Sequence, residues 1–283
     1  MMNMLLLNKL SELPKKYTIT ERLPKTQFST LYKGFDQETE KQIVIKQCLY
    51  HNDFRREVIA SVKIFAKGYN EHIVPVLASY PDTRILVMPY LEAGLVWDLR
   101  RKKKGLTPEE VLDITAQTGK ALEQVHAVGI IHNDIKSGNI LLTGSEKSDQ
   151  KLTAKLTDFG LSCCQIPRLE PDRGAGTREY SAPEKFKTSG TLTSAVDIYS
   201  LGLMIHEMLT NTLIYGDISY SNRLDDSDIE KILHQRAKPI PAHEKIPEKI
   251  LPVIRTACEY KPKNRYRNVT EMISALEKAV HGV

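Results

Sequence analysis

Two short motifs in the middle of the chain, at 132–139 and 157–160, place the strongest constraint on its fold. The first reads H-N-D-I-K-S-G-N, the second reads T-D-F-G, and an apolar run at 140–142 follows the first. Two acids, a lysine and an amide therefore lie close together along the chain. In phosphoryl transfer, one carboxylate orients the attacking hydroxyl, another holds a metal ion, and cations offset charge on the phosphate oxygens. The two motifs therefore indicate phosphoryl-transfer chemistry.

The residues before these motifs favour a small β-sheet. Short runs of β-type residues alternate with turns, which predicts strands over 17–23, 29–35, 43–49, 73–79 and 84–88. One helical stretch, 54–65, interrupts them. At the start of the chain, Leu6, Leu10 and Leu13 have the spacing of one helix face, which predicts a short helix within residues 1–16.

From Thr107 onwards the pattern changes to helices. Thr107 as N-cap, Pro108 at the first helical position and Glu110 at the third predict the start of a long helix. Further helices are expected over 196–209 and 269–280. With 41% hydrophobic residues, the 283-residue chain has enough apolar material for a large core. We therefore expect a small sheet-rich lobe followed by a larger helical one.

Together with A-P-E at 182–184, the two central motifs make the chain resemble the eukaryotic-like serine/threonine protein kinases. The resemblance covers about residues 17–280. It implies an α+β, bilobal protein-kinase-like fold, in which the N-lobe, about 17–90, is a small antiparallel sheet. The C-lobe, about 91–280, would be larger and helical, and residues 1–16 would form an N-terminal extension.

The same resemblance implies roles for the residues of the motifs. Asp134 would be the catalytic base, and Lys136 would be the cation that faces the γ-phosphate. Asn139 and Asp158 would bind Mg²⁺, or Mn²⁺ in its place. ATP would be the phosphate donor, and a serine or threonine of a protein substrate would be the acceptor.

A second group of residues is expected to hold the nucleotide. The segment 43–46 reads I-V-I-K and is similar to the V-A-I-K strand of the family, so Lys46 would contact the α- and β-phosphates. Glu57, in the predicted helix, is the expected partner of Lys46, and Glu71 is a weaker competitor because it lies outside the helical pattern. The other expected nucleotide contacts are Leu23, Leu31, Val44, Met88, Tyr90, Leu91 and Leu141.

Residues after the second motif also follow the family. Glu184, of the A-P-E sequence, would pair with Arg265 in a structural role. Lys136, two places after the expected base, and the pair Gly176–Thr177 resemble the serine/threonine group rather than the tyrosine kinases. Thr177 would contact Lys136 and the expected base as part of the surface that receives the substrate.

The chain departs from the family at five positions. Pro24, Thr26 and Ser29 occupy the three glycine positions of the loop that covers the phosphates. Glycine there lets backbone N–H groups approach the phosphates, and proline has no N–H, so ATP binding should weaken. Val44 replaces the alanine that packs against adenine. Asn133 replaces the arginine that gathers a phosphorylated activation segment, so we expect activity that does not depend on phosphorylation of that segment.

Three functions therefore stay open. The first is a serine/threonine protein kinase, which has the complete set of expected catalytic residues. The second is a pseudokinase that acts as a scaffold or an allosteric partner, which the missing glycines favour. The third is a small-molecule kinase, a class that lacks the A-P-E segment. If the protein is a serine/threonine kinase, the sequence does not decide whether it needs an activating partner.

Composition bears on partners and location. Forty Lys and Arg against 35 Asp and Glu give a net charge of +5, too mild an excess to indicate nucleic acid. The four cysteines lack metal-site spacing, which predicts reduced, mostly buried thiols. No apolar run is long enough for a membrane span. We expect a cytoplasmic protein, or alternatively a bacterial effector delivered into a host cell.

Three smaller features give further expectations. The charged run 100–104 (R-R-K-K-K) is expected to be a solvated face, with binding of an acidic partner as the alternative. Trp97 is expected in the core of its helix. His132 is expected to pack beneath Phe159 and not to act as a base.

Overall fold

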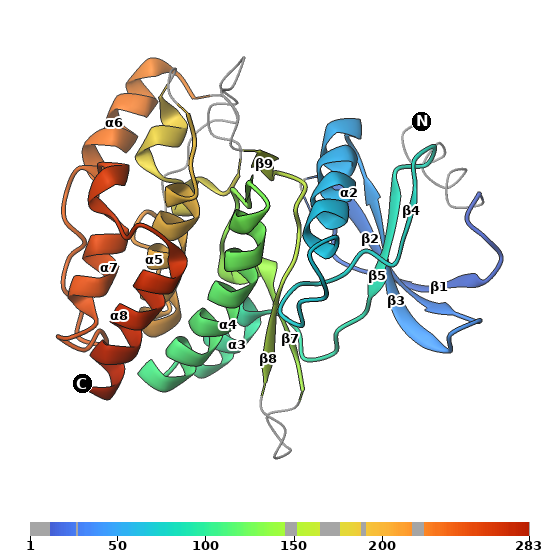
Figure 1. Ribbon diagram of the computed structural model, residues 1–283, viewed down its shortest axis with the longest axis horizontal. Coiled ribbons are helices and arrows are strands. Elements are labelled where there is room, and N and C mark those ends of the chain that lie inside the picture. The colour runs from blue at the N-terminus through green and yellow to red at the C-terminus, as the bar shows by residue number, and fades with distance from the viewer. Residues whose placement is uncertain are drawn as a thin grey trace.

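The computed structural model describes residues 12–26, 28–144, 152–164, 176–187, 191–216 and 224–282. It has a sheet-rich lobe and a helical lobe, which lie on opposite sides of the molecule (Figure 1). The predicted α+β, bilobal fold class is therefore confirmed. The helix expected within residues 1–16 lies almost entirely outside the described residues.

The N-terminal lobe is built on one antiparallel sheet of five strands in the order β1-β2-β3-β5-β4. The strands are β1 (Tyr17–Arg22), β2 (Ser29–Asp36), β3 (Lys41–Cys48), β4 (Ala78–Tyr80) and β5 (Ile85–Pro89). Alternate residues of β3 and β5, among them Ile43, Ile45, Ile85 and Val87, pack together as a buried cluster. The strand predictions hold for four of the five segments.

The fifth strand prediction is largely wrong. Of the segment 73–79, only the end belongs to a strand, in β4. Ile73 instead forms an isolated bridge with Leu156 of the other lobe. Pro75 follows shortly and has no N–H for a sheet ladder, which explains why a regular strand does not begin here.

One helix, α2 (His51–Phe65), accompanies the sheet (Figure 1). It begins before the predicted Phe54 because its first turn carries polar residues that give no apolar signal. Ala60 and Ile64 on its buried face belong to the large core of the helical lobe. The helix therefore connects the two lobes by packing.

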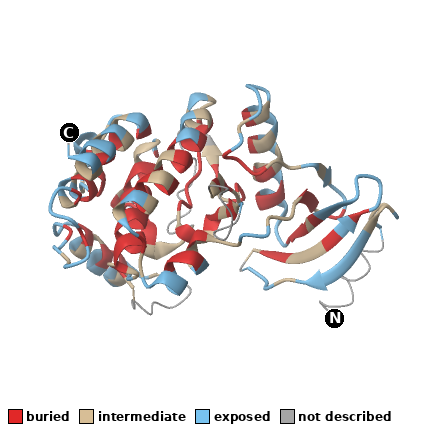
Figure 2. Ribbon diagram, turned by 90° about the horizontal axis from the view of Figure 1, so that it is seen from below, coloured by how far each residue is buried: buried red, intermediate tan, exposed pale blue. Residues whose placement is uncertain are grey.

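The C-terminal lobe is mainly helical. Its helices are α3 (Val96–Lys103), α4 (Pro108–Ala127), α5 (Ala195–Thr210), α6 (Asp226–Arg236), α7 (Leu251–Ala257) and α8 (Val269–His281). All residues of α5 from Val196 to Thr210 are buried, so α5 forms the centre of this lobe (Figure 2). The predictions for α4, α5 and α8 are confirmed, whereas α6 and α7 were not predicted.

Short elements carry the central motifs between the lobes. The strand pairs are β6 (Ile130–Ile131) with β9 (Cys163–Cys164), and β7 (Ile140–Thr143) with β8 (Thr153–Leu156). The 3₁₀ turns are η1 (Ser137–Asn139), η2 (Arg178–Tyr180), η3 (Pro183–Phe186) and η4 (Pro262–Asn264). The motif at 132–139 therefore runs from β6 through η1 into β7.

Two expectations for α3 are corrected. Arg100, at the start of the charged run, is 3% exposed, and its Nη2 lies 2.5 Å from the Glu207 carboxylate of α5. Only the following residues, 101–104, are exposed. Trp97 is half-buried rather than in the core, and its ring stacks 4.0 Å from the Arg100 guanidinium.

The described cysteines fit the expectation of buried thiols. Cys48 and Cys258 are buried, and Cys163 is half-buried. Burial raises the pKa of both Cys48 and Cys258 to about 12, which keeps them protonated at neutral pH. Among the described helices, none combines the length and the apolar character that crossing a bilayer requires.

Candidate active site

A cavity of about 480 Å³ lies where the two lobes meet. Its apolar lining includes every residue expected to contact the base and sugar of a nucleotide: Leu23, Leu31, Val44, Met88, Tyr90, Leu91 and Leu141. Lys46, Asn139 and Asp158 line the same cavity. The fold therefore brings the expected nucleotide contacts and the polar motif residues to one place.

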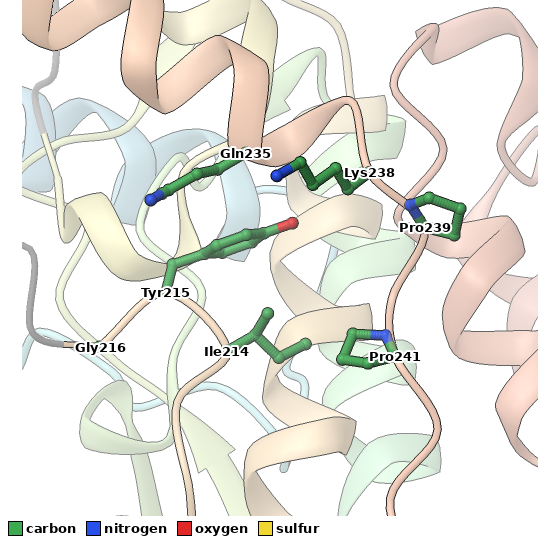
Figure 3. Close-up of a pocket in the computed structure, with 7 residues that line it drawn as sticks. All are labelled: Ile214, Tyr215, Gly216, Gln235, Lys238, Pro239 and Pro241. Carbon is green, nitrogen blue, oxygen red and sulfur yellow. The ribbon is translucent and has the colours of Figure 1, made fainter.

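A second cavity, of about 350 Å³, lies in the helical lobe. It is lined by Ile214, Tyr215, Gly216, Gln235, Lys238, Pro239 and Pro241 (Figure 3). None of these described lining residues carries a carboxylate, the group that phosphoryl transfer requires. The cavity between the lobes is the candidate active site.

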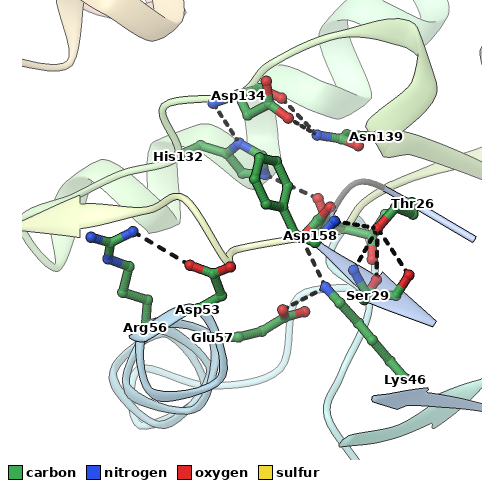
Figure 4. A network of polar contacts seen from close by, with 12 residues as sticks. Thr26, Ser29, Lys46, Asp53, Arg56, Glu57, His132, Asp134, Asn139 and Asp158 are labelled. Atoms are coloured by element: carbon green, nitrogen blue, oxygen red, sulfur yellow. Dashed lines mark hydrogen bonds and ion pairs between the residues drawn. The ribbon is translucent and has the colours of Figure 1, made fainter. Parts of the chain in front are cut away.

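Lys46 is the centre of a buried group of charges in the first cavity. Its Nζ lies 2.6 Å from Glu57 Oε2 and 2.8 Å from Asp158 Oδ1 (Figure 4). The lysine comes from β3, Glu57 from α2 and Asp158 from the second motif. Burial alone would lower the pKa of Lys46, but the two carboxylates outweigh it and raise the pKa above its ordinary value. Glu71, the weaker candidate, accepts from Lys155 through its carbonyl instead.

Two oxygen donors are suited to a metal ion. Asp158 keeps 35% of its side chain exposed although Lys46 binds one of its oxygens. Asn139 donates through Nδ2 to Asp134, which leaves its amide oxygen for another partner. One ammonium facing two carboxylates leaves one net negative charge, so Mg²⁺ fits this site in charge and in ligand type. Across the described residues, no group of three or more His, Cys, Asp or Glu forms an all-protein metal site.

Asp134 is fixed by contacts from three directions. Its Oδ1 accepts the backbone N–H of Thr177 at 2.8 Å, and its Oδ2 lies 2.9 Å from Lys136 Nζ and from Asn139 Nδ2. Burial would raise the pKa of Asp134, but the charges of Lys136 and Lys185 and these hydrogen bonds lower it to about 2. Lys136 Nζ also donates to Thr177 Oγ1 at 2.6 Å, as expected from the sequence.

The turn that carries Asp134 is held from below by Asp197 of α5. Its two carboxylate oxygens accept the backbone N–H groups of His132, at 2.9 Å, and Asn133, at 2.8 Å. His126 of α4 contacts the same carboxylate at 2.8 Å. Asn133 has a φ of 70°, a left-handed conformation that these bonds stabilise.

His132 has the packing role expected of it. Its ring meets the ring of Phe159 edge-on, with centroids 4.8 Å apart. Its Nδ1 accepts from the backbone N–H of Asp134, and its Nε2 contacts the Thr157 carbonyl. Burial lowers the pKa of His132, so the ring is neutral at neutral pH.

The loop over the cavity closes on itself through Thr26. The Thr26 hydroxyl accepts the backbone N–H groups of Phe28, at 3.2 Å, and Ser29, at 3.0 Å. It also lies 2.8 Å from the Ser29 hydroxyl (Figure 4). Two backbone donors of the kind that a phosphate could use are therefore already bound to a side chain of the loop.

The sequence did not indicate two of the residues that shape this site. Asp197 lies in α5, and its contacts to the turn at 132–133 depend on the docking of that helix. Lys185 is a lysine directly after A-P-E that the fold buries beside Asp134. The only indication of this position in the sequence is that a lysine directly follows the A-P-E motif.

Comparison with known proteins agrees with this geometry. Residues 17–276 match the family model described as protein kinase domain. A protein of Clostridium perfringens (strain 13 / Type A), named a probable serine/threonine-protein kinase, is 29% identical over 280 residues. The match covers 94% of this chain and 38% of that protein, so the chain spans well under half the length of this relative.

Proposed function

Since the chain belongs to the protein kinase family, we propose that it is a serine/threonine protein kinase that transfers the γ-phosphate of ATP to a protein hydroxyl. The observation that carries the proposal is the joining of two charged groups around one cavity. Lys46, Glu57 and Asp158 form the first, of which Lys46 and Asp158 line the cavity. Asp134 and Lys136 form the second, which meets the cavity through Asn139, a lining residue that donates to Asp134. A site with both can bind a nucleotide and orient an acceptor.

In this proposal Asp134 is the residue that receives the acceptor hydroxyl. Its carboxylate is ionised at neutral pH, so it orients the hydroxyl by accepting its hydrogen bond. It takes the proton as the new P–O bond forms and the bond between the γ-phosphate and the departing ADP breaks. Lys136, 2.9 Å away, offsets the negative charge that develops on the transferred group. Thr177 holds both side chains in place. Mg²⁺, held by Asp158 and Asn139, would neutralise charge on the phosphate oxygens; Mn²⁺ is the alternative ion.

Binding of the nucleotide would use the sheet-rich lobe. We propose that Lys46, aligned by Glu57, contacts the α- and β-phosphates and that the apolar cavity residues enclose the base. The backbone N–H of Tyr90 is bonded to the Gln42 carbonyl at 3.1 Å. The neighbouring backbone of Pro89 and Leu91 is therefore the part of this segment that we expect to contact adenine.

We also propose that activity does not depend on phosphorylation of the segment that follows Asp158. Ser162 is 4% exposed, so its hydroxyl is poorly accessible to another kinase. Asn133 carries no charge that could bind a phosphate, and its side chain instead donates to the Leu161 carbonyl at 3.0 Å. Replacing Ser162→Ala should therefore leave turnover unchanged, whereas a large loss of turnover would contradict this part of the proposal.

The test is transfer of labelled γ-phosphate from ATP with Mg²⁺ or Mn²⁺ to the protein itself and to a basic protein substrate. The control is Asp134→Asn, which keeps the shape of the side chain and removes its charge. Label on serine or threonine that disappears in the variant would support the proposal. Label on tyrosine would contradict the acceptor class, and label confined to free sugars, cholines or aminoglycosides would indicate a small-molecule kinase.

One observation favours the alternative of a pseudokinase that acts as a scaffold or allosteric partner. The Thr26 hydroxyl accepts two loop N–H groups that a phosphate could otherwise use, and this opposes nucleotide binding. Transfer that is absent with both metal ions would favour this alternative or a required activating partner. The boundaries of the catalytic domain at 17–280, with lobes meeting near 90, and a cytoplasmic or host-cell location remain predictions from the sequence.

A further inference from the structure

Lys185 is a buried lysine that links two separate segments of the site. It lies in η3, is 3% exposed, and its Nζ donates to the Asn133 carbonyl at 2.7 Å. We call residues 132–139 the catalytic loop and residues 176–186 the substrate-side segment. The Lys185 side chain therefore extends from the substrate-side segment to the catalytic loop.

Gly176 shows how closely the two segments meet. A Cβ atom added to this glycine would lie 3.0 Å from Lys185 Nζ, 3.2 Å from the Asn133 carbonyl oxygen and 3.3 Å from Asp134 Oδ1. Gly176 also has a φ of 102°, which side chains rarely adopt. The ammonium of Lys185 therefore occupies the space beside Asp134 that a side chain at 176 would otherwise fill.

The substrate-side segment touches the catalytic loop at both of its ends. At its start, the backbone N–H of Thr177 donates to Asp134 Oδ1. At its end, Lys185 donates to the residue directly before Asp134. Together with the Lys136–Thr177 hydrogen bond, these contacts join the two segments at both ends of the substrate-side segment.

Burial of an ammonium group is unfavourable unless hydrogen bonds and negative charge compensate for it. Among the described residues, the Asn133 carbonyl and the neighbouring Asp134 carboxylate supply such compensation at Lys185. A lysine kept in such a place needs both segments in their present positions. Its burial therefore couples the position of the substrate-side segment to that of the catalytic loop.

We propose that Lys185 is a positioning residue, which together with Thr177 clamps the substrate-side segment onto the catalytic loop and so fixes the acceptor relative to Asp134. The catalytic consequence rests on the proposed kinase function. The clamp itself is a property of the folded chain, and it can be measured in a protein that transfers no phosphate.

The first experiment therefore measures the clamp without activity. Hydrogen exchange of the Thr177 amide is compared between the wild type and Lys185→Met, which keeps the length of the side chain and removes its charge. Lys187→Met is the matched control, because Lys187 is exposed and lies over the Tyr260 ring instead. We expect exchange at Thr177 to accelerate at least about tenfold in Lys185→Met only, with exchange in α5 unchanged.

The second experiment measures steady-state phosphate transfer with the same proteins. We expect kcat to fall by about 10-fold to 100-fold in Lys185→Met, because a small misplacement of reacting groups has effects of this size. The KM for ATP should stay unchanged, because Lys185 does not line the nucleotide cavity. Lys185→Arg, which keeps a cation and donors, should recover part of kcat.

Three results separate the outcomes. Exchange at Thr177 that is the same in Lys185→Met and Lys187→Met overturns the clamp. Faster exchange with an unchanged kcat overturns the positioning role. If the wild type transfers no phosphate, the proposed function fails, while the exchange comparison still decides the clamp. If Lys185→Met does not fold, Lys185→Gln, which keeps a polar group in the buried site, replaces it in both experiments.

Discussion

Arg265 and Glu184 form a two-pronged ion pair across 81 positions of the chain, with Nη1–Oε1 at 2.6 Å and Nη2–Oε2 at 2.8 Å. The Arg265 side chain is fully buried, and the Glu184 side chain is 15% exposed. Arg265 also donates to the Ala195 carbonyl, at the start of α5. The pair predicted from the A-P-E motif is confirmed, and it fastens the end of the substrate-side segment to the centre of the helical lobe.

Replacing Glu184→Gln should destabilise the protein by about 3 kcal/mol, because it leaves a buried guanidinium without its counter-charge. The midpoint of urea unfolding measures this change. The control is Glu38→Gln, which breaks the exposed pair with Lys16 and should leave the midpoint nearly unchanged. Equal effects of the two changes would contradict the importance of the buried pair.

Replacing Glu57→Gln should reduce kcat/KM for ATP by about 10-fold to 100-fold, because Lys46 loses the charge that aligns it. The initial rate of phosphate transfer measures this effect. Glu71→Gln is the matched control, because Glu71 was the other candidate partner from the sequence and does not contact Lys46 in the structure. An equal loss of kcat/KM in Glu71→Gln would show that Glu57 is not the specific partner of Lys46.

Replacing Thr26→Ala should strengthen binding of ATP by about fivefold, because two loop N–H groups lose their intramolecular acceptor and one hydrogen bond contributes about 1 kcal/mol. Isothermal titration with a non-hydrolysable ATP analogue measures the dissociation constant. Thr20→Ala, in β1, is the control because its hydroxyl bonds only to the Lys33 carbonyl. Weaker binding in Thr26→Ala would mean that the closed loop favours the nucleotide.

His206, buried in α5, should make the protein less stable in acid. Burial lowers its pKa from 6.5 to about 4, with a smaller contribution from His243. The unfolded chain therefore binds more protons between pH 6.5 and 4, so stability falls as the pH decreases through this range. In His206→Gln the midpoint of urea unfolding should fall less steeply there. His234→Gln, at an exposed position of α6, should behave like the wild type.

Local chemistry made some elements predictable. The Thr107 hydroxyl accepts the Glu110 N–H at 3.3 Å, and the Glu110 carboxylate accepts the Thr107 N–H at 2.9 Å. This capping box was predicted because all of its partners lie within one turn of helix. The buried face of α4, which includes Val111, Ile114, Thr118, Leu122 and Val125, is set by local spacing in the same way.

Contacts between distant segments explain where the sequence was insufficient. Arg100 is read from the sequence as part of a charged surface, but Glu207 lies far along the chain and only the docking of α3 on α5 pairs the two. The contact of Lys185 could not be predicted for the same reason, because the Asn133 carbonyl that accepts its hydrogen bond belongs to another segment. In the candidate site, the motifs predicted which side chains meet, and the structure added the residues that hold them there.

The contacts of Asp197 have a consequence for synthesis of the protein. The catalytic loop leaves the ribosome well before α5, yet the carboxylate that shapes the loop belongs to α5. A nascent chain that already contains both central motifs therefore still lacks the carboxylate that bonds the backbone of residues 132 and 133. Because a domain completes its folding only after the required segments have emerged, the catalytic loop would take its final shape only once α5 has left the ribosome.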